Sequence, residues 1–180
     1  MKATGIVRRI DDLGRVVIPK EIRRTMRIRE GDPLEIYTDN DGEVIFKKYS
    51  PIGELSAFSG QFAEILSKAV SCPVIVCDRD HVISVSGMPK KEVLERRVSA
   101  SLEEMMEQRK SYIYESDSQR KLQPIEGVDR YALVQYPIIA AGDVCGAIMM
   151  FSGENGGYCT EIENKLIQTA AAFLGKQLEE

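Results

Sequence analysis

The pattern of apolar and polar positions near the N-terminus predicts short strands around one short helix. Alternating apolar and basic residues favour strands at residues 5–10 and 15–18, joined by an Asp-rich, Gly-ended turn at residues 11–14. Pro19 ends the second strand, because proline has no N–H to donate to a ladder, and it suits the start of a helix over residues 20–26. The two strands are therefore expected to form a hairpin that leads directly into the helix.

A second hairpin completes this unit. Its strands are predicted at residues 34–38 and 43–48, on either side of a turn rich in Asp, Asn and Gly. A unit of about 50 residues lies near the lower limit for burying a sufficient core by itself. Its apolar residues need more cover than one pair of hairpins provides. We therefore expect an obligate dimer, in which a second copy of the chain supplies the missing cover.

A change of pattern near residue 50 predicts a second domain of mixed helices and strands. A linker at residues 51–55, which contains proline and glycine, is expected to separate a domain of residues 1–50 from one of residues 56–180. Ser101 begins a predicted helix and is followed three residues later by Glu104, the spacing of a capping box. Strands are predicted at residues 73–78, 81–86, 111–114, 130–139 and 143–152. Two inner helices are predicted at residues 89–97 and 101–109.

Helices with an apolar stripe are predicted at both ends of the second domain. The helix over Glu54–Val70 has apolar residues alternately three and four positions apart, a heptad seam that lasts for little more than two heptads. The helix over Thr160–Leu178 begins with a capping box of Thr160 and Glu163. The first stripe fits packing within its own domain and pairing between subunits equally well. If the two helices continue into a partner's pair as a bundle, dimers formed by the N-terminal unit would join into a tetramer.

Basic residues are concentrated near the N-terminus, although the whole chain is acidic. The first 29 residues contain nine Lys and Arg and three Asp and Glu, a net charge of +6, whereas the 180 residues together carry −4. Such a concentration on an acidic protein indicates an anionic partner. The acidic residues between Glu30 and Glu43 are expected to face away from that partner, because carboxylates next to phosphates repel each other.

The run LGRVVIPKEIRR, at residues 13–24, lies in a segment of residues 2–49 that resembles the DNA-binding domain of AbrB-type transition-state regulators. The resemblance implies a dimeric swapped-hairpin β-barrel, in which two chains interleave their hairpins, and double-stranded DNA as the partner. It also implies sporulation genes as targets, activated or repressed. The family's contact arginines fall on Arg8, Arg15, Arg23 and Arg24, and three more basic residues close to them are Arg9, Lys2 and Lys20.

The rest of the chain, from Glu54 to Glu180, resembles a GAF domain in element order and length. The resemblance implies an α+β fold with an antiparallel sheet and flanking helices. A GAF-like domain behind a DNA-binding domain suggests sensing, through a small molecule that binds one domain arrangement better than another. No Gly-rich phosphate loop or aromatic cage between Cys72 and Ser152 identifies such a ligand. A surface that serves dimerisation alone is the other possibility for this domain.

The sequence offers little for catalysis or metal binding, so no catalytic residue, cofactor or metal is expected. His81 is the single histidine, and the cysteines lack the C-x-x-C spacing of metal sites. Buried thiols are the expected state of Cys72, Cys77, Cys145 and Cys159. The cysteines leave open a thiol-dependent methionine-sulfoxide reductase on the GAF fold. The barrel leaves open an antitoxin, although antitoxins generally continue into a disordered tail.

No membrane segment is expected. The first residues, MKATGIVRRIDD, have no apolar run before their charges, and no window approaches the 18 apolar residues of a spanning helix. We therefore expect a cytoplasmic, nucleoid-associated regulator that is not an enzyme.

Overall fold

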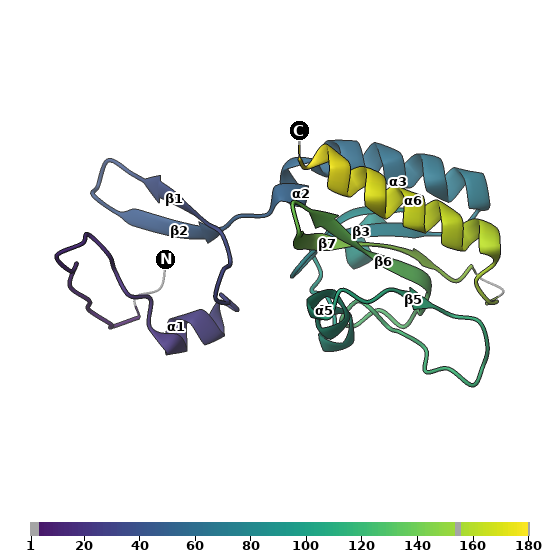
Figure 1. The fold of residues 1–180 in the computed structure, drawn as a ribbon, viewed down its shortest axis with the longest axis horizontal. Helices are drawn as coiled ribbons and strands as arrows, with labels where there is room; N and C mark the ends of the chain where they lie inside the picture. Colours follow the sequence, from purple (N-terminus) through teal and green to yellow (C-terminus); the bar gives the residue numbers. More distant parts are fainter. Residues whose placement is uncertain (1–3, 154–155, 180) are drawn as a thin grey trace. The chain divides into compact units, whose positions relative to one another are not determined.

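The chain folds into two compact units, and the boundary in the sequence lies between Tyr49 and Ser50. The computed structural model describes residues 4–153 and 156–179 (Figure 1). Each unit has its own sheet, of two strands in the N-terminal unit and of five in the C-terminal unit. None of the helices in the described part of the chain has both the length and the apolar character needed to span a bilayer.

The N-terminal unit contains helix α1 (Lys20–Thr25) and an antiparallel hairpin of strands β1 (Leu34–Thr38) and β2 (Val44–Lys48). The predictions of this helix and these strands are confirmed to within a residue. The turn closes locally, because the Asp39 carboxylate accepts a hydrogen bond from the backbone N–H of Glu43 (2.9 Å).

A buried carboxylate ties the loop that follows α1 to strand β2. Asp32, whose side chain is only 4% exposed, lies 3.6 Å from Lys48 Nζ and accepts a hydrogen bond from the backbone N–H of Arg29 (2.8 Å). Lys48 Nζ also donates to the carbonyl of Arg27 (2.9 Å). Asp32 is therefore a structural group, and the prediction that the acidic residues face away from the anionic partner stays a prediction.

The strands predicted at residues 5–10 and 15–18 are not formed within this single chain. The turn between them does close, through a hydrogen bond from the Asp11 N–H to the Arg15 carbonyl (3.0 Å). A strand needs a neighbouring strand as its ladder partner, and the described part of one chain offers neither segment such a partner. Apolar side chains consequently stay exposed.

The C-terminal unit is built on a five-stranded antiparallel sheet in the order β4-β3-β7-β6-β5. The prediction of an antiparallel sheet flanked by helices is confirmed. Its strands are β3 (Val74–Asp78), β4 (Val82–Ser86), β5 (Tyr112–Ile113), β6 (Ala132–Ala140) and β7 (Asp143–Phe151).

Helices cover both faces of this sheet (Figure 1). The long helices α3 (Ser56–Val70) and α6 (Glu161–Gln177) lie side by side on one face. The short helices α4 (Lys90–Val93) and α5 (Ala100–Glu107) contribute to the core on the other face. The sheet is thus buried on both sides.

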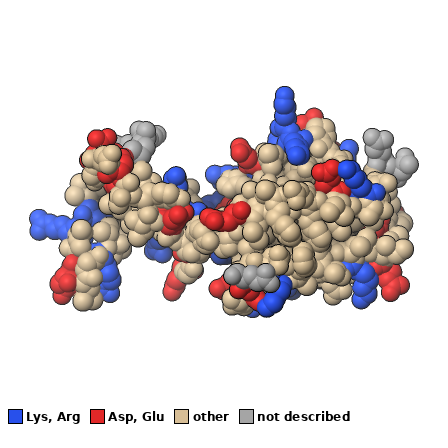
Figure 2. All heavy atoms as spheres, turned by 90° about the horizontal axis from the view of Figure 1, so that it is seen from above, with Lys and Arg blue, Asp and Glu red and all other residues tan. Residues whose placement is uncertain are grey.

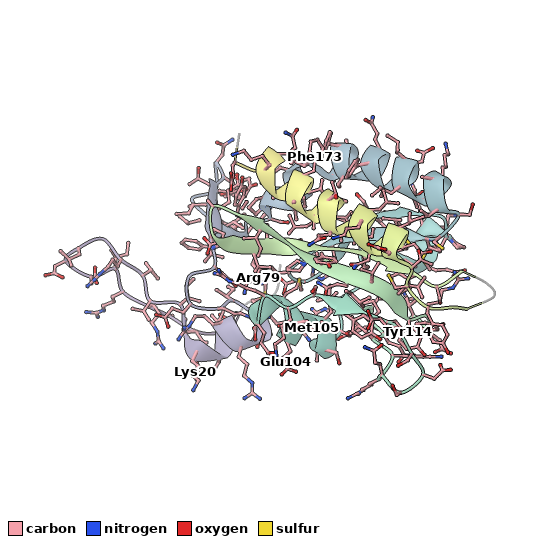
Figure 3. The ribbon with its side chains drawn as sticks, turned by 45° about the vertical axis from the view of Figure 1, so that its right-hand side comes forward. Lys20, Arg79, Glu104, Met105, Tyr114 and Phe173 are labelled. Atoms are coloured by element: carbon pink, nitrogen blue, oxygen red, sulfur yellow. The ribbon has the colours of Figure 1, made fainter. Side chains whose placement is uncertain are left out.

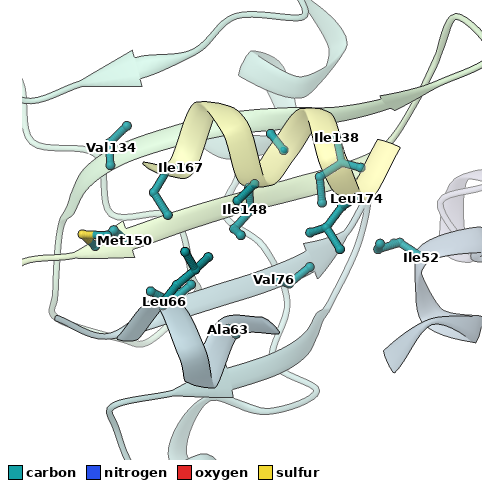
Figure 4. Packing of buried hydrophobic residues seen from close by; sticks show 13 residues of the cluster. Ile52, Ala63, Leu66, Val76, Val134, Ile138, Ile148, Met150, Ile167 and Leu174 are labelled. Carbon is teal, nitrogen blue, oxygen red and sulfur yellow. The ribbon is translucent and has the colours of Figure 1, made fainter. Parts of the chain in front are cut away.

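An apolar core fills each face of the sheet. The core under α3 and α6 includes Val76, Ile148 and Leu174 (Figure 4), and the core on the opposite face includes Cys77 and Met149. Successive strand residues alternate between the two cores, because the side-chain period of a strand is two.

Residues 51–55, predicted to be a linker, contain a short helix, α2 (Pro51–Glu54). The side chain of Ser50 caps it by accepting a hydrogen bond from the Gly53 N–H (3.2 Å). Ile52 is fully buried in the core beneath α3 and α6. This segment therefore packs as part of the C-terminal unit.

The helix predicted at residues 89–97 ends at Val93, because the following residues pair with the sheet edge. Val82 of β4 donates to the carbonyl of Arg96 and accepts from the N–H of Glu95, both at 2.9 Å. The local sequence permits a longer helix, and the backbone hydrogen bonds to β4 prevent it.

The capping box predicted for Ser101 and Glu104 is wrong. Helix α5 begins one residue earlier, and the side chain of Ser99 caps it by accepting a hydrogen bond from the Leu102 N–H (3.3 Å). The capping box predicted at the start of α6 is confirmed.

Candidate nucleic-acid interface

Helix α1 carries three basic side chains that project into solvent. Lys20, Arg23 and Arg24 are exposed, and none of them forms an ion pair with any residue that the structure describes. Figure 3 shows Lys20 on this helix, with its side chain directed away from the chain. Lys20 is three and four residues from the two arginines, so the three cations share one side of α1. Like charges at this spacing repel and destabilise a helix slightly, which favours a role toward an external anion.

Three further predicted contact residues lie on either side of the first turn. Arg8 and Arg9 are exposed in the extended segment before the turn, and Arg15 follows the turn directly. Lys2 lies outside the described residues. Figure 2 shows Lys and Arg side chains standing out from the surface of the N-terminal unit, with acidic side chains among them.

Arg15 is held in place by Asp11 while most of its guanidinium stays in solvent. One Asp11 oxygen accepts hydrogen bonds from the backbone N–H groups of Arg15 (2.8 Å) and Leu13 (3.0 Å), and the other accepts from Arg15 Nε (2.8 Å). These hydrogen bonds from Arg15 lower the pKa of Asp11, so the carboxylate is ionised at neutral pH. The Arg15 side chain is 68% exposed, so its terminal nitrogens are available to an external phosphate or base edge.

The acidic hairpin uses some of its charges locally. Asp39 shapes the turn between β1 and β2, and Glu35 accepts a hydrogen bond from the Tyr37 hydroxyl. Lys47 stacks over the ring of the same tyrosine, with 4.3 Å between Nζ and the ring centre. The Lys47 ammonium thus has a partner within the hairpin, the ring of Tyr37, and needs no external anion.

The thiols of the C-terminal unit are poor nucleophiles. Burial raises the pKa of Cys77, and it raises the pKa of Cys159 to about 11 with a smaller contribution from the Glu163 charge. Burial also raises the pKa of Cys72 and of Cys145. All four thiols are therefore protonated at neutral pH, whereas thiol catalysis requires the thiolate. In the described part of the chain no cluster of His, Cys, Asp and Glu has the makeup of a metal site.

The burial of one polar residue of the C-terminal unit was not predicted from the sequence. Gln135 lies in the middle of β6 and is fully buried. Its only signal is a single carboxamide inside the apolar run ALVQYPII, at residues 132–139.

A surface groove of about 330 Å³ lies between α3 and the end of β4, where Ser67 and Lys68 line it.

Two family models together match nearly the whole chain. The model described as stage V sporulation protein T C-terminal, transcription factor, matches residues 54–179. The model described as antidote-toxin recognition MazE, bacterial antitoxin, matches residues 7–53.

Two curated relatives come from Bacillus subtilis (strain 168). The chain is 53% identical to stage V sporulation protein T over 182 aligned positions, which cover 100% of both proteins. It is 65% identical to transition state regulatory protein AbrB over 51 residues, which are 28% of this chain and 52% of that protein. The N-terminal resemblance to AbrB-type regulators is confirmed.

Solved structures share the fold of the C-terminal unit. The GAF domain of an Acinetobacter phosphoenolpyruvate-protein phosphotransferase is 12% identical, with a TM-score of 0.54 over 69% of this chain and 81% of that one. A type II free methionine-R-sulfoxide reductase from Thermoplasma acidophilum is 11% identical, with a TM-score of 0.52 over 71% of this chain and 94% of that one. At these identities the likeness shows a GAF fold and nothing about activity.

Exposed arginines on an AbrB-like domain, followed by a GAF-like domain, define a two-domain DNA-binding transcription regulator. The match over the full length then identifies the family within this class. The chain belongs to the stage V sporulation protein T family of transcription factors.

Proposed function

We propose that the N-terminal unit, paired with a second copy, binds duplex DNA through Arg8, Arg15, Arg23 and Arg24. The observation that carries this proposal is the pair Arg23 and Arg24, exposed on α1 and without an ion pair among the described residues. Arg9, Lys20 and Lys2 are proposed as secondary contacts.

The chemistry of the guanidinium group fits this role. Its planar fork binds phosphate oxygens in a bidentate manner, and it can also read O6 and N7 of guanine in the major groove. A dimer presents each arginine twice in a symmetric arrangement. Contacts to phosphates would supply affinity and a steep dependence on salt, whereas base edges and DNA shape would supply sequence preference.

The test replaces both helix arginines in the full chain, as Arg23→Ala with Arg24→Ala. We expect affinity for duplex DNA to fall by about 10- to 100-fold, with a shallower dependence of log K on log salt, because each lost phosphate contact removes about 0.9 from the slope. Fluorescence anisotropy across a salt series measures both quantities.

The matched control is Lys90→Ala with Lys91→Ala, which removes the same charge from exposed positions of α4 in the other unit. We expect it to bind as the parent does. A double arginine variant that is folded and binds with the affinity and the salt slope of the parent would refute this surface.

We further propose that the chain forms a dimer through the N-terminal barrel and a tetramer through the helices predicted at Glu54–Val70 and Thr160–Leu178. Exposed apolar side chains on α3 and α6 support the second contact, since Ile65 is 65% and Ile162 70% exposed. Phe173 of α6 is 43% exposed (Figure 3) and extends a ring cluster with Phe58 and Phe62 of α3. Pairing of this surface between two chains would remove its apolar area from water.

The C-terminal unit is proposed to modulate the DNA-binding unit and to hold a small molecule, and the chain is proposed to lack enzymatic activity of its own. Its protonated thiols and its transcription-factor family support the absence of the reductase activity. A cytoplasmic location at the nucleoid follows from a DNA partner and is proposed with it.

A further inference from the structure

Arg15 differs from the other arginines of the proposed DNA-binding surface in how its side chain is held. Its Nε donates a hydrogen bond to Asp11 Oδ2 at 2.8 Å. The other four, by contrast, form no ion pair with any residue that the structure describes; they are Arg8, Arg9, Arg23 and Arg24. A guanidinium held at one angle suits a different task from one that moves freely.

The carboxylate that holds Arg15 is itself fixed by the backbone. Asp11 Oδ1 accepts hydrogen bonds from the N–H groups of Arg15 (2.8 Å) and Leu13 (3.0 Å), so Oδ2 has one orientation. Exposed ion pairs usually contribute little, because two flexible side chains must be ordered at once. Here only the arginine needs ordering. All these contacts lie within residues 11–15, so the arrangement does not depend on a second copy of the chain.

The hydrogen bond to Asp11 leaves the useful end of the guanidinium free. Nη1 and Nη2 of Arg15 have no hydrogen bond to any residue in the described part of the chain, and the side chain is 68% exposed. Two adjacent N–H groups in one plane complement O6 and N7 of guanine. Orientation matters most for such a base edge, because its two acceptors have fixed positions in the major groove. A fork that is ordered before binding loses less entropy there.

The charge of Asp11 is hard to explain by the turn alone. A carboxylate near DNA repels the phosphates and lowers affinity for any duplex. Asparagine would supply the same turn with an acceptor oxygen and no charge. Only the second oxygen, which binds Arg15 Nε, requires a carboxylate. The next residue, Asp12, is exposed and its side chain has no partner among the described residues.

We propose that Arg15 recognises a guanine through Nη1 and Nη2, and that Asp11 is a positioning residue that holds the guanidinium at the required angle. The proposal rests on the proposed DNA-binding surface and assigns base recognition to one of its arginines. Arg23 and Arg24, which no carboxylate holds, are left to contact phosphates.

The experiment compares two duplexes, one enriched from a random pool by the full-length parent and one with the same base composition in shuffled order. Fluorescence anisotropy gives the ratio of the two affinities. We expect Asp11→Asn to lower this ratio by about 5- to 100-fold. Its affinity for the shuffled duplex is expected to equal or exceed that of the parent, because a negative charge is gone. Asparagine keeps one oxygen for the turn and turns an NH₂ group toward Nε, which releases the arginine.

Asp12→Asn is the matched control, because it removes the same charge from the neighbouring position and leaves Arg15 held. We expect its affinity ratio to equal that of the parent. Equal ratios for Asp11→Asn and Asp12→Asn would mean that Asp11 acts through its charge alone, and the proposal would fail. A parent that enriches no preferred duplex would overturn it as well.

Arg15→Lys separates the shape of the side chain from its charge. Lysine keeps the positive charge and the backbone of the turn and lacks the planar fork. We expect this variant to bind the shuffled duplex as the parent does and to lose the preference for the enriched one. An unchanged ratio would identify Arg15 as a phosphate contact and would overturn the assignment to a base.

Modified bases test the predicted partner atoms directly. In the enriched duplex, 7-deazaguanine removes the N7 acceptor, and we expect the affinity of the parent to fall about 10-fold. Asp11→Asn and Arg15→Lys are expected to bind the modified and unmodified duplexes equally. Inosine is the control base, because it keeps O6 and N7 and lacks only the minor-groove amino group. An equal loss in the parent and both variants would place guanine recognition at another residue.

The double variant Arg23→Ala with Arg24→Ala separates this inference from the function on which it rests. We expect it to weaken binding to both duplexes by the same factor and to keep their ratio. An unchanged ratio in Asp11→Asn, together with weak binding by the double variant, would overturn the role of Asp11 and leave the DNA-binding surface intact.

Discussion

Gly175 shows how a single residue sets the distance between a helix and the sheet. A Cβ atom at this position of α6 would lie 2.2 Å from the carbonyl oxygen of Ile139 in β6, closer than any such atoms approach. Only glycine therefore lets this turn of the helix rest directly on the strand. The contact is set by tertiary packing, and nothing in the local sequence distinguishes Gly175 from a glycine that merely weakens a helix.

The first prediction is that Gly175→Ala destabilises the C-terminal unit. The added methyl group must push α6 away from β6, and we expect the free energy of unfolding to fall by about 1–3 kcal/mol. Urea unfolding of the full chain, followed by circular dichroism, measures the change.

Gly60 of α3 provides the matched control for that substitution. A Cβ atom there would meet only the Ser84 hydroxyl oxygen, at an ordinary 3.7 Å. Gly60→Ala is therefore expected to leave stability unchanged or to raise it by about 0.5–1 kcal/mol, since alanine loses less backbone entropy in a helix. Equal changes in the free energy of unfolding for the two substitutions would mean that the close approach of Gly175 to β6 does not require glycine.

At the scale of elements, the start of α6 is specified by the local sequence. The Thr160 hydroxyl accepts a hydrogen bond from the Glu163 N–H (3.4 Å), and the Glu163 carboxylate accepts one from the Thr160 N–H (2.7 Å). Two N–H groups that the helix itself cannot satisfy are thus paired by residues three positions apart. The start of this helix can be predicted from the sequence because the two residues of its capping box lie close together in the chain.

We predict that Thr160→Ala lowers the free energy of unfolding by about 1 kcal/mol, because one N–H at the helix start loses its acceptor. Thr160→Ser keeps the hydroxyl and is expected to lie within about 0.5 kcal/mol of the parent. Chemical denaturation of the three proteins under one set of conditions makes the comparison. A serine variant as unstable as the alanine variant would contradict the capping explanation.

Elements that depend on distant partners were harder to predict. The pattern at residues 89–97 is helical, yet Glu95 and Arg96 pair with Val82 on the sheet edge. The pattern at residues 130–139 identified β6 correctly, but only the tertiary fold leaves Gln135 buried and unpaired. The basic cluster was visible from composition, whereas the 68% exposure of Arg15 beside its Asp11 partner required the structure.

At the scale of the whole molecule, the proposed tetramer is open to a direct test. Multi-angle light scattering at micromolar concentration is expected to give the mass of four chains for the parent. Phe173→Lys places a charge within the exposed apolar surface of α6 and is expected to give the mass of two chains.

Gln168→Lys is the control, because it adds the same charge to an exposed polar position of α6 that lies on a different side of the helix from Phe173. We expect this variant to remain a tetramer. A parent that elutes with the mass of two chains would exclude the second interface.

The first segment of the chain leaves Val7 84% and Val17 69% exposed and gives its backbone no strand partner in the described part of one chain. In a barrel completed only by a second copy, the binding-competent species forms in proportion to the square of the free chain concentration. At concentrations low enough for most chains to be unpaired, halving the amount of chain would cut the occupancy of an unsaturated target site by more than half. In that range of concentration such a regulator responds to its own dilution more sharply than a monomer could.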